Sequence, residues 1–420
     1  MKKTISFTIS FITLAALSCM AINEADIIAR ISVNSGNYER FETPVSVSID
    51  FLTHIHEEEL GLYEYINGEH KPVPVQFSPG EERRMHWLLS GSTRPGAVRI
   101  FDLAREKPAG KSKIMKVDYH NGSYTMFAGD KPVLEYNSGT VYPPPEANQA
   151  YRRSGFVHPL YSPEGNVLTA IQPPDHLHHY GMWNPWTRTT LRGEEIDFWN
   201  LAKEQGRVRY SGTASLEEGA VFGSLEVLHE HIAWPDTPDE FIAMNELQEL
   251  RVYNRSDGTF LIDVISKLNP VETITLEEYR YGGFVFRGTA EWTRETSDFF
   301  TSRGNDRDHA DGQRAEWCVV TGKTASGQSG MVMMGYPANY NHPEPLRVWP
   351  SDANRGRGDV FINFSPTRNT SWTLEPGSSY MLRYRLLVFE GEADREMASG
   401  IWNDYSNPPL ITLEKVTGEE

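Results

Sequence analysis

The chain has 420 residues, of which 39% are hydrophobic and 23% charged, and its formal net charge is −17. This length is enough for two domains with large cores, and an acidic surface without a basic run repels nucleic acid and anionic membranes. We therefore expect no nucleic-acid partner. Ten Trp and 19 Tyr residues favour β-sheet, and flat aromatic rings also suit the binding of sugars.

Residues 1–22 are predicted to be a signal peptide, because two lysines precede an apolar run over residues 5–17. The run is too short to span a membrane, and no later segment approaches spanning length. Cys19 follows an imperfect lipobox, which allows a lipid anchor. The only other cysteine is Cys318, so the mature chain has no disulfide framework. Export without disulfides indicates the periplasm or the cell surface.

Residues 23–110 are predicted to form a small β-sandwich domain. Apolar and polar residues alternate over residues 45–51, which is typical of a strand with one buried face. Asn67 and Gly68 stand between two short β-like segments and indicate a hairpin turn. A polar stretch then separates this domain from the next.

Residues 114–392 are predicted to form a large, curved antiparallel β-sandwich. Short β-like segments recur throughout, and the Asn-Gly and Asp-Gly pairs that end at Gly122 and Gly258 indicate hairpin turns. Helical periodicity is scarce, and the best candidate covers residues 393–405 within a C-terminal helix and tail at 393–420. The fold class is therefore all-β, with a small β-domain before the large sandwich.

Histidines, carboxylates and indoles concentrate between residues 174 and 199. In an extended segment His176 and His178 would share one face, and His179 would point to the other. Two imidazoles near a carboxylate such as Asp197 suit either a metal ion or acid/base chemistry on a sugar. The indoles that would line a sugar subsite are Trp183, Trp186 and Trp199.

Four later residues could complete such a site. Glu249 is a candidate ligand or base, although it shares a strand face with Arg251 and the two could form an exposed ion pair. Arg287 follows a flexible Gly-Gly pair and could clamp a hydroxyl or carboxylate group. Asn339 and His342 belong to a polar loop that could cover the site.

The histidine segment resembles the signature of the PmoA-like domain family, over residues 124 to 391. The residues that carry the resemblance are Asp175, His176, His178, His179, Gly181 and Trp183, followed by Asp197, Phe198 and Trp199. The resemblance implies a large β-domain with a site at this segment, in exported bacterial proteins found with sugar-degrading enzymes. It does not imply a membrane methane oxygenase, which would need spanning helices.

The leading hypothesis is an exported carbohydrate-active enzyme, a glycoside hydrolase or lyase acting on a glycan. Its expected catalytic residues are His176, His178, His179, Asp197 and Glu249. Its expected substrate-binding residues are Trp183, Trp186, Trp199, Arg287, Asn339 and His342. Two alternatives remain: a metal-dependent oxygenase or hydrolase with a divalent metal at His176 and His178, and a non-catalytic glycan-binding protein.

Overall fold

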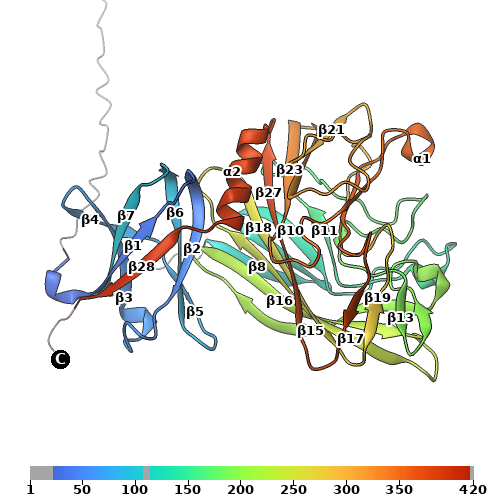
Figure 1. The fold of residues 1–420 in the computed structure, drawn as a ribbon, viewed down its shortest axis with the longest axis horizontal. Helices are drawn as coiled ribbons and strands as arrows, with labels where there is room; N and C mark the ends of the chain where they lie inside the picture. The colour runs from blue at the N-terminus through green and yellow to red at the C-terminus, as the bar shows by residue number, and fades with distance from the viewer. Residues whose placement is uncertain (1–21, 107–113, 417–420) are drawn as a thin grey trace, which may run out of the picture.

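The computed structural model describes residues 22–106 and 114–416. A small β-domain lies at one end of the molecule and a large antiparallel β-sandwich at the other, with a helix between them (Figure 1). The predicted fold class is therefore confirmed. Cys19 and residues 1–21 of the predicted signal peptide lie outside the described residues. Within the described ranges, no helix is long and apolar enough to cross a membrane.

The small domain is made of two sheets that pack around their own apolar core. Its five-stranded sheet has the order β28-β1-β7-β3-β4, with β1 (Ile27–Asn34), β3 (Leu60–Ile66), β4 (Glu69–Val73), β7 (Val98–Arg105) and β28 (Leu410–Lys415). Its three-stranded sheet has the order β2-β6-β5, with β2 (Arg40–Ser48), β5 (Gln76–Ser78) and β6 (Arg84–Thr93). Ile31, Trp87 and Phe101 lie in this core. The turn predicted at Asn67 and Gly68 joins β3 to β4.

The large domain packs two eight-stranded antiparallel sheets face to face. The first sheet holds β8 (Met115–His120), β9 (Ser123–Ala128), β10 (Lys131–Asn137), β11 (Phe156–Leu160), β12 (Met182–Trp183), β20 (Phe284–Arg287), β24 (Leu346–Val348) and β25 (Phe361–Phe364). The second sheet holds β15 (Gly206–Glu217), β16 (Phe222–Ala233), β17 (Phe241–Tyr253), β18 (Phe260–Pro270), β21 (Ser297–Thr301), β22 (Trp317–Thr324), β23 (Gly327–Gly335) and β27 (Tyr380–Glu390). A small sheet flanks them, with β13 (Thr189–Leu191), β14 (Glu194–Ile196), β19 (Ile274–Leu276) and β26 (Trp372–Leu374).

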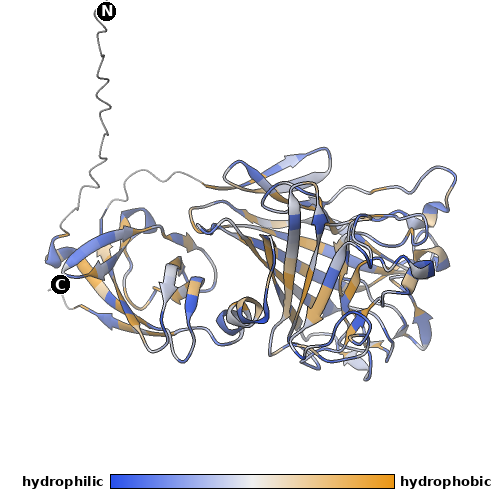
Figure 2. Cartoon of the chain, turned by 90° about the horizontal axis from the view of Figure 1, so that it is seen from above, coloured by the Kyte–Doolittle hydropathy of each residue, from blue (hydrophilic) through white to orange (hydrophobic). Residues whose placement is uncertain are grey.

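Alternation along the strands creates both the core of the large domain and the surface that carries the site. Hydrophilic and hydrophobic residues alternate along many of its strands (Figure 2). On β20, Phe286 belongs to the core between the two large sheets, whereas Val285 faces the opposite way into a separate cluster of aromatic side chains. Phe361 on β25 and Trp183 on β12 join Val285 there. Successive strand residues point to opposite faces, so one sheet serves two clusters.

The short helices lie in loops, and one longer helix joins the domains. They are η1 (Glu24–Asp26), η2 (Glu57–Glu59), η3 (Gln149–Tyr151), η4 (Leu201–Lys203), α1 (Ala353–Gly356) and α2 (Arg395–Ser406). α2 occupies the position where periodicity predicts a helix, and Asp394 caps it by accepting a hydrogen bond from the Met397 amide. Its Asp404 accepts hydrogen bonds from Arg40 at 3.0 Å and Thr43 at 2.7 Å, which ties the helix to the small domain.

Candidate functional site

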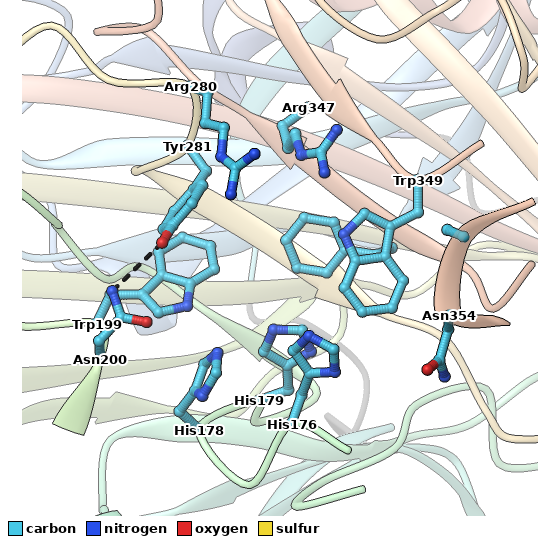
Figure 3. A pocket seen from close by; sticks show the side chains of 12 residues that line it. His176, His178, His179, Trp199, Asn200, Arg280, Tyr281, Arg347, Trp349 and Asn354 are labelled. Carbon is cyan, nitrogen blue, oxygen red and sulfur yellow. Dashed lines mark hydrogen bonds between the residues drawn. The ribbon is translucent and has the colours of Figure 1, made fainter. Parts of the chain in front are cut away.

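Six short segments of the large domain meet around a cavity of about 380 Å³ (Figure 3). Its lining residues are His176, His178, His179, Trp199, Asn200, Arg280, Tyr281, Arg347, Trp349, Ala353, Asn354 and Phe361. The cavity lies over the aromatic cluster on the outer face of the first sheet. Consecutive strands of that sheet carry several of these segments, so residues far apart in the sequence meet here.

The three histidines come from a loop of successive turns, not from an extended strand. The Ile171–Tyr180 bridge closes this loop, and the amides of His176 and His179 donate to the carbonyls of Pro173 and His176 at 2.8 and 3.0 Å. The predicted alternation of His176, His178 and His179 between two faces is therefore wrong. Tight turns bring all three imidazoles to the same cavity, with ring centroids 4.8 to 5.6 Å apart.

A glycine fixes the end of the histidine loop. Gly181 has a φ of 57°, and a Cβ at this position would lie 2.2 Å from the carbonyl oxygen of Val157. A larger residue would push the loop away from β11 and move the imidazoles with it. The glycine is thus part of what positions the site.

Burial keeps two of the imidazoles neutral. It lowers the pKa of His178 to about 4 and that of His179 well below the ordinary range. The Nδ1 atom of His179 is buried and has no hydrogen-bond partner among the described residues. His176 instead has its Nδ1 atom 2.7 Å from the carboxylate of Asp175. At neutral pH His178 and His179 are therefore unprotonated, and among the described residues neither is hydrogen-bonded to a carboxylate.

Aromatic rings form two walls of the cavity. The Trp199 and Tyr281 rings lie 4.7 Å apart, and those of Trp349 and Phe361 lie 5.1 Å apart. Trp183, predicted to line a subsite, is 2% exposed and packs 5.5 Å from the His179 ring. Trp183 does not line the cavity and thus supports the histidines from the interior, while Trp199 and Trp349 line the cavity although they are only 2% and 9% exposed.

Asp197 acts on the site through its neighbours. Its carboxylate accepts hydrogen bonds from the amides of Trp199 and Asn200 at 2.9 and 2.8 Å, and from the Asn200 side chain at 2.8 Å. Lys203 pairs with the same carboxylate at 2.9 Å. Asn200 in turn donates to the Tyr281 hydroxyl at 3.3 Å. Asp197 is buried and lies behind the cavity, where it orients Trp199 and Asn200.

Arginines lie on the side of the cavity opposite the histidines (Figure 3). Arg347 pairs with Asp311 at 2.8 Å, and exposed Arg280 has no ion pair within the described ranges. Arg287, predicted to bind substrate, is buried behind Trp349, 4.8 Å from its ring and 3.2 Å from the Asp359 carboxylate. The lining residues include no Asp or Glu. The cavity therefore offers cations and neutral imidazoles without a carboxylate.

Besides Trp183, Asp197 and Arg287, which lie behind the lining, four further predicted residues do not reach this cavity. Glu249 lies on β17 and bonds to Arg251 at 2.7 Å, as the ion-pair alternative expects. Trp186 is 1% exposed in the core between the sheets. Asn339 donates to the Arg383 carbonyl at 2.9 Å, and His342 belongs to the same loop but not to the lining. Glu249 lies within β17, Trp186 follows β12, and Asn339 and His342 follow β23. Local sequence does not reveal how these strands pack relative to the cavity.

One alternative from the sequence is a divalent metal at His176 and His178. Over residues 22–106 and 114–416, no group of three or more His, Cys, Asp or Glu side chains is arranged to hold a metal ion. The nearest carboxylate, Asp175, is hydrogen-bonded to His176.

A second histidine cluster is sealed inside the large domain. His231 and His229 lie 2.9 and 3.4 Å from one carboxylate oxygen of Glu246, and Tyr136 bonds to the other side of His229 at 2.6 Å. Ser266 donates to the second oxygen of Glu246 at 2.6 Å. Burial would raise the pKa of Glu246, but hydrogen bonds from His229 and His231 bring it below the ordinary range. We name these residues the core histidine cluster.

Sequence reasoning missed most of the cavity wall, although Asn200 directly follows the predicted Trp199. Eight of the twelve lining residues were not predicted as site residues: Asn200, Arg280, Tyr281, Arg347, Trp349, Ala353, Asn354 and Phe361. Arg280 and Tyr281 stand beside the Gly-Gly pair that drew attention to Arg287. Asn200, Arg280 and Tyr281 could thus have been found because they lie next to residues that the sequence analysis discussed. Arg347 and Trp349 have no such neighbour in the sequence.

Comparisons with known proteins place the chain in a family without giving it a function. No curated protein matches it. A protein in the glycosyl hydrolase family 38 from Enterococcus faecalis aligns with a TM-score of 0.46 and 9% identity, over 95% of this chain and 48% of that one. This chain thus spans about half the length of that protein. A galactose mutarotase related enzyme from Lactobacillus acidophilus aligns with a TM-score of 0.33 and 7% identity, over 66% of this chain and 100% of that one.

The family model that matches residues 123–403 is that of a family of unknown function, DUF6807. It is not the PmoA-like family that the histidine segment resembles, so the expected family assignment is wrong. The matched residues cover nearly the whole large domain and α2. The chain belongs to the DUF6807 family.

Proposed function

We propose that this member of the DUF6807 family is a carbohydrate-active enzyme that cleaves acidic glycans by β-elimination. The observation that carries the proposal is the composition of the cavity. Neutral imidazoles face two arginines across aromatic walls, and no Asp or Glu is among the lining residues. A uronate sugar has the matching groups: a carboxylate for the arginines, a weakly acidic C–H for a base and an apolar face for the rings.

Hydrolysis of a glycosidic bond in most known cases needs two carboxyl groups that flank the bond. Glu249 bonds to Arg251 on the second sheet, and the carboxylate of Asp197 is committed to Asn200 and Lys203. Neither belongs to the lining of the cavity. Of the two reaction types expected from the sequence, the lyase is therefore the one that we favour.

In the proposed reaction, Arg280 and Arg347 bind the uronate carboxylate and stabilise the charge that develops on it. His178 removes the proton from C5, and the electron pair of that C–H bond forms the double bond between C4 and C5. The C4–O bond breaks, and its oxygen receives a proton from the Tyr281 hydroxyl. The pKa of Tyr281 is raised to about 12 by burial, so this hydroxyl carries a proton at neutral pH.

The test is a screen of purified protein on polygalacturonate, alginate and chondroitin, with xylan as a neutral comparison. Ultraviolet absorbance detects the unsaturated product of elimination, and a reducing-end assay detects elimination and hydrolysis alike. We expect both signals on an acidic polymer. New reducing ends without absorbance would show a hydrolase, and binding without either signal would favour the non-catalytic alternative.

Export is part of the proposal, because polysaccharides of this kind lie outside the cytoplasm. Cell fractionation of the full chain tests it, and a protein confined to the cytoplasm would contradict it.

A further inference from the structure

A second hollow of about 640 Å³ adjoins the cavity. Its lining residues are Pro174, Asp175, His176, Asn354, Arg355 and Arg357. His176 and Asn354 line both hollows, so these two side chains stand between them. An oligosaccharide bound in the first hollow can therefore extend into the second.

The second hollow presents an arginine without a partner. Arg355 is exposed, and its guanidinium makes no hydrogen bond or ion pair with the described part of the chain. Arg357 is committed, since it pairs with Asp359 at 2.9 Å and donates to the Ala290 carbonyl at 2.7 Å. The one carboxylate in this lining, Asp175, is already bonded to His176. Arg355 is thus the cation that remains free for a ligand.

An unusual backbone conformation places Arg355. Asn354 and Arg355 have φ angles of 52° and 60°, in the left-handed region that residues other than glycine rarely adopt. Asn354 is held there by a hydrogen bond from its side chain to Asp359, the carboxylate that also pairs with Arg287 and Arg357. A buried carboxylate therefore anchors the turn, while its exposed arginine faces the hollow.

We propose that the second hollow is a subsite for a further anionic sugar of the same chain, whose carboxylate or sulfate group is bound by Arg355. This inference rests on the proposed function, because it assumes that the first hollow holds a sugar. It adds that the substrate is an acidic oligosaccharide, with at least two charged sugars bound in adjacent hollows.

Equilibrium binding to the full-length His178→Asn protein tests the subsite, since this variant should not consume the ligand. The probes are galacturonate, its dimer and trimer, a sulfated disaccharide and lactose. We expect Arg355→Ala to weaken binding of the dimer about fivefold, to leave galacturonate unchanged and to lose its effect in high salt. Arg355→Glu should weaken the dimer further. Arg94→Ala, an exposed arginine of the small domain, is the matched control.

The outcomes separate this inference from the proposed function. If dimer binding depends on Arg355 but the unsubstituted protein shows no turnover, the subsite is supported and the lyase is overturned. Turnover with a dimer affinity that neither Arg355 variant changes would overturn the subsite alone. If the unsubstituted protein and the His178→Asn protein bind none of the acidic probes, both the subsite and the lyase are contradicted. If Arg355→Ala weakens binding of the sulfated disaccharide more than binding of the galacturonate dimer, the anionic group that Arg355 binds is a sulfate.

Discussion

The two histidine clusters of the large domain use the same side chain in opposite ways. His176, His178 and His179 lie on a loop of turns at the wall of a cavity. The core histidine cluster places His229 and His231 on β16, where they are 2% and 0% exposed and share the carboxylate of Glu246.

The difference lies in what occupies the ring nitrogens. In the core histidine cluster, Glu246 and Tyr136 contact both nitrogens of His229, and Glu246 contacts Nε2 of His231, so the network links β16 to β17 and β10. The Nδ1 atom of His231 has no hydrogen-bond partner among the described residues. At the cavity, burial suppresses protonation of His178 and His179 without a carboxylate as partner. The two clusters therefore differ in the shared carboxylate: the core histidines surround Glu246, whereas His178 and His179 line a cavity without a carboxylate in its lining.

The largest expected effect is on catalysis, through His178. If His178 is the base, His178→Asn lowers turnover of an acidic glycan by about 10²- to 10⁴-fold, while the free energy of unfolding changes by less than about 1 kcal/mol. Steady-state kinetics and urea unfolding measure the two quantities. His342→Asn is the control, since His342 does not line the cavity. If His178→Asn and His342→Asn lose the same amount of turnover, the loss does not depend on lining the cavity and His178 is not the base.

The next effect is on stability, through Glu246. Glu246→Gln removes the charge that His229 and His231 surround, and we expect it to lower the free energy of unfolding by about 3 kcal/mol. Glu249→Gln, three positions along β17, should cost less than about 1 kcal/mol, because Glu249 is less deeply buried. Urea unfolding compares them. Similar values would mean that the core histidine cluster adds no special stability.

The smallest effect is the pH dependence of stability. An unfolded histidine takes up a proton below about pH 6.5, whereas folded His178 does so only near its pKa of about 4. The unfolded state thus binds more protons in this window, and stability falls as the pH falls. His178→Asn should make this dependence shallower, by at most about 1.4 kcal/mol per pH unit.

The control for the pH experiment has the opposite sign. Asp306 raises the pKa of exposed His309, so protonation of His309 adds stability as the pH falls. His309→Asn should therefore leave the dependence steeper or unchanged. Urea unfolding at several pH values measures all three proteins, and a shallower dependence in His309→Asn would contradict the assignment.

Local sequence was sufficient for the fold class, because turns and alternation are local properties. Asn67 and Gly68 close the β3–β4 hairpin, and Asn121 and Gly122 close the β8–β9 hairpin, as predicted. The tail was harder to predict. β28 pairs with β1 across the length of the chain, and nothing within six residues reveals such a partner.

The site was predictable in part for the same reason. The imidazoles and Trp199 are close in sequence, so their meeting at one cavity could be foreseen. Arg280 and Arg347 reach it through the order of strands β20, β25 and β24, which depends on pairing over tens of residues. The error over the face of His179 arose because turns, not an extended strand, follow Ile171.

The pairing of β28 with β1 also sets an order of events during synthesis. β1 pairs with β7 on one side, and its other side receives β28, whose register runs from Ala29 opposite Lys415 to Asn34 opposite Leu410. On the ribosome, the amides along that side of β1 cannot bond to β28 until residues 410–415 have emerged. The nascent protein therefore carries an open edge that another strand could occupy, and β28 is the strand that closes it.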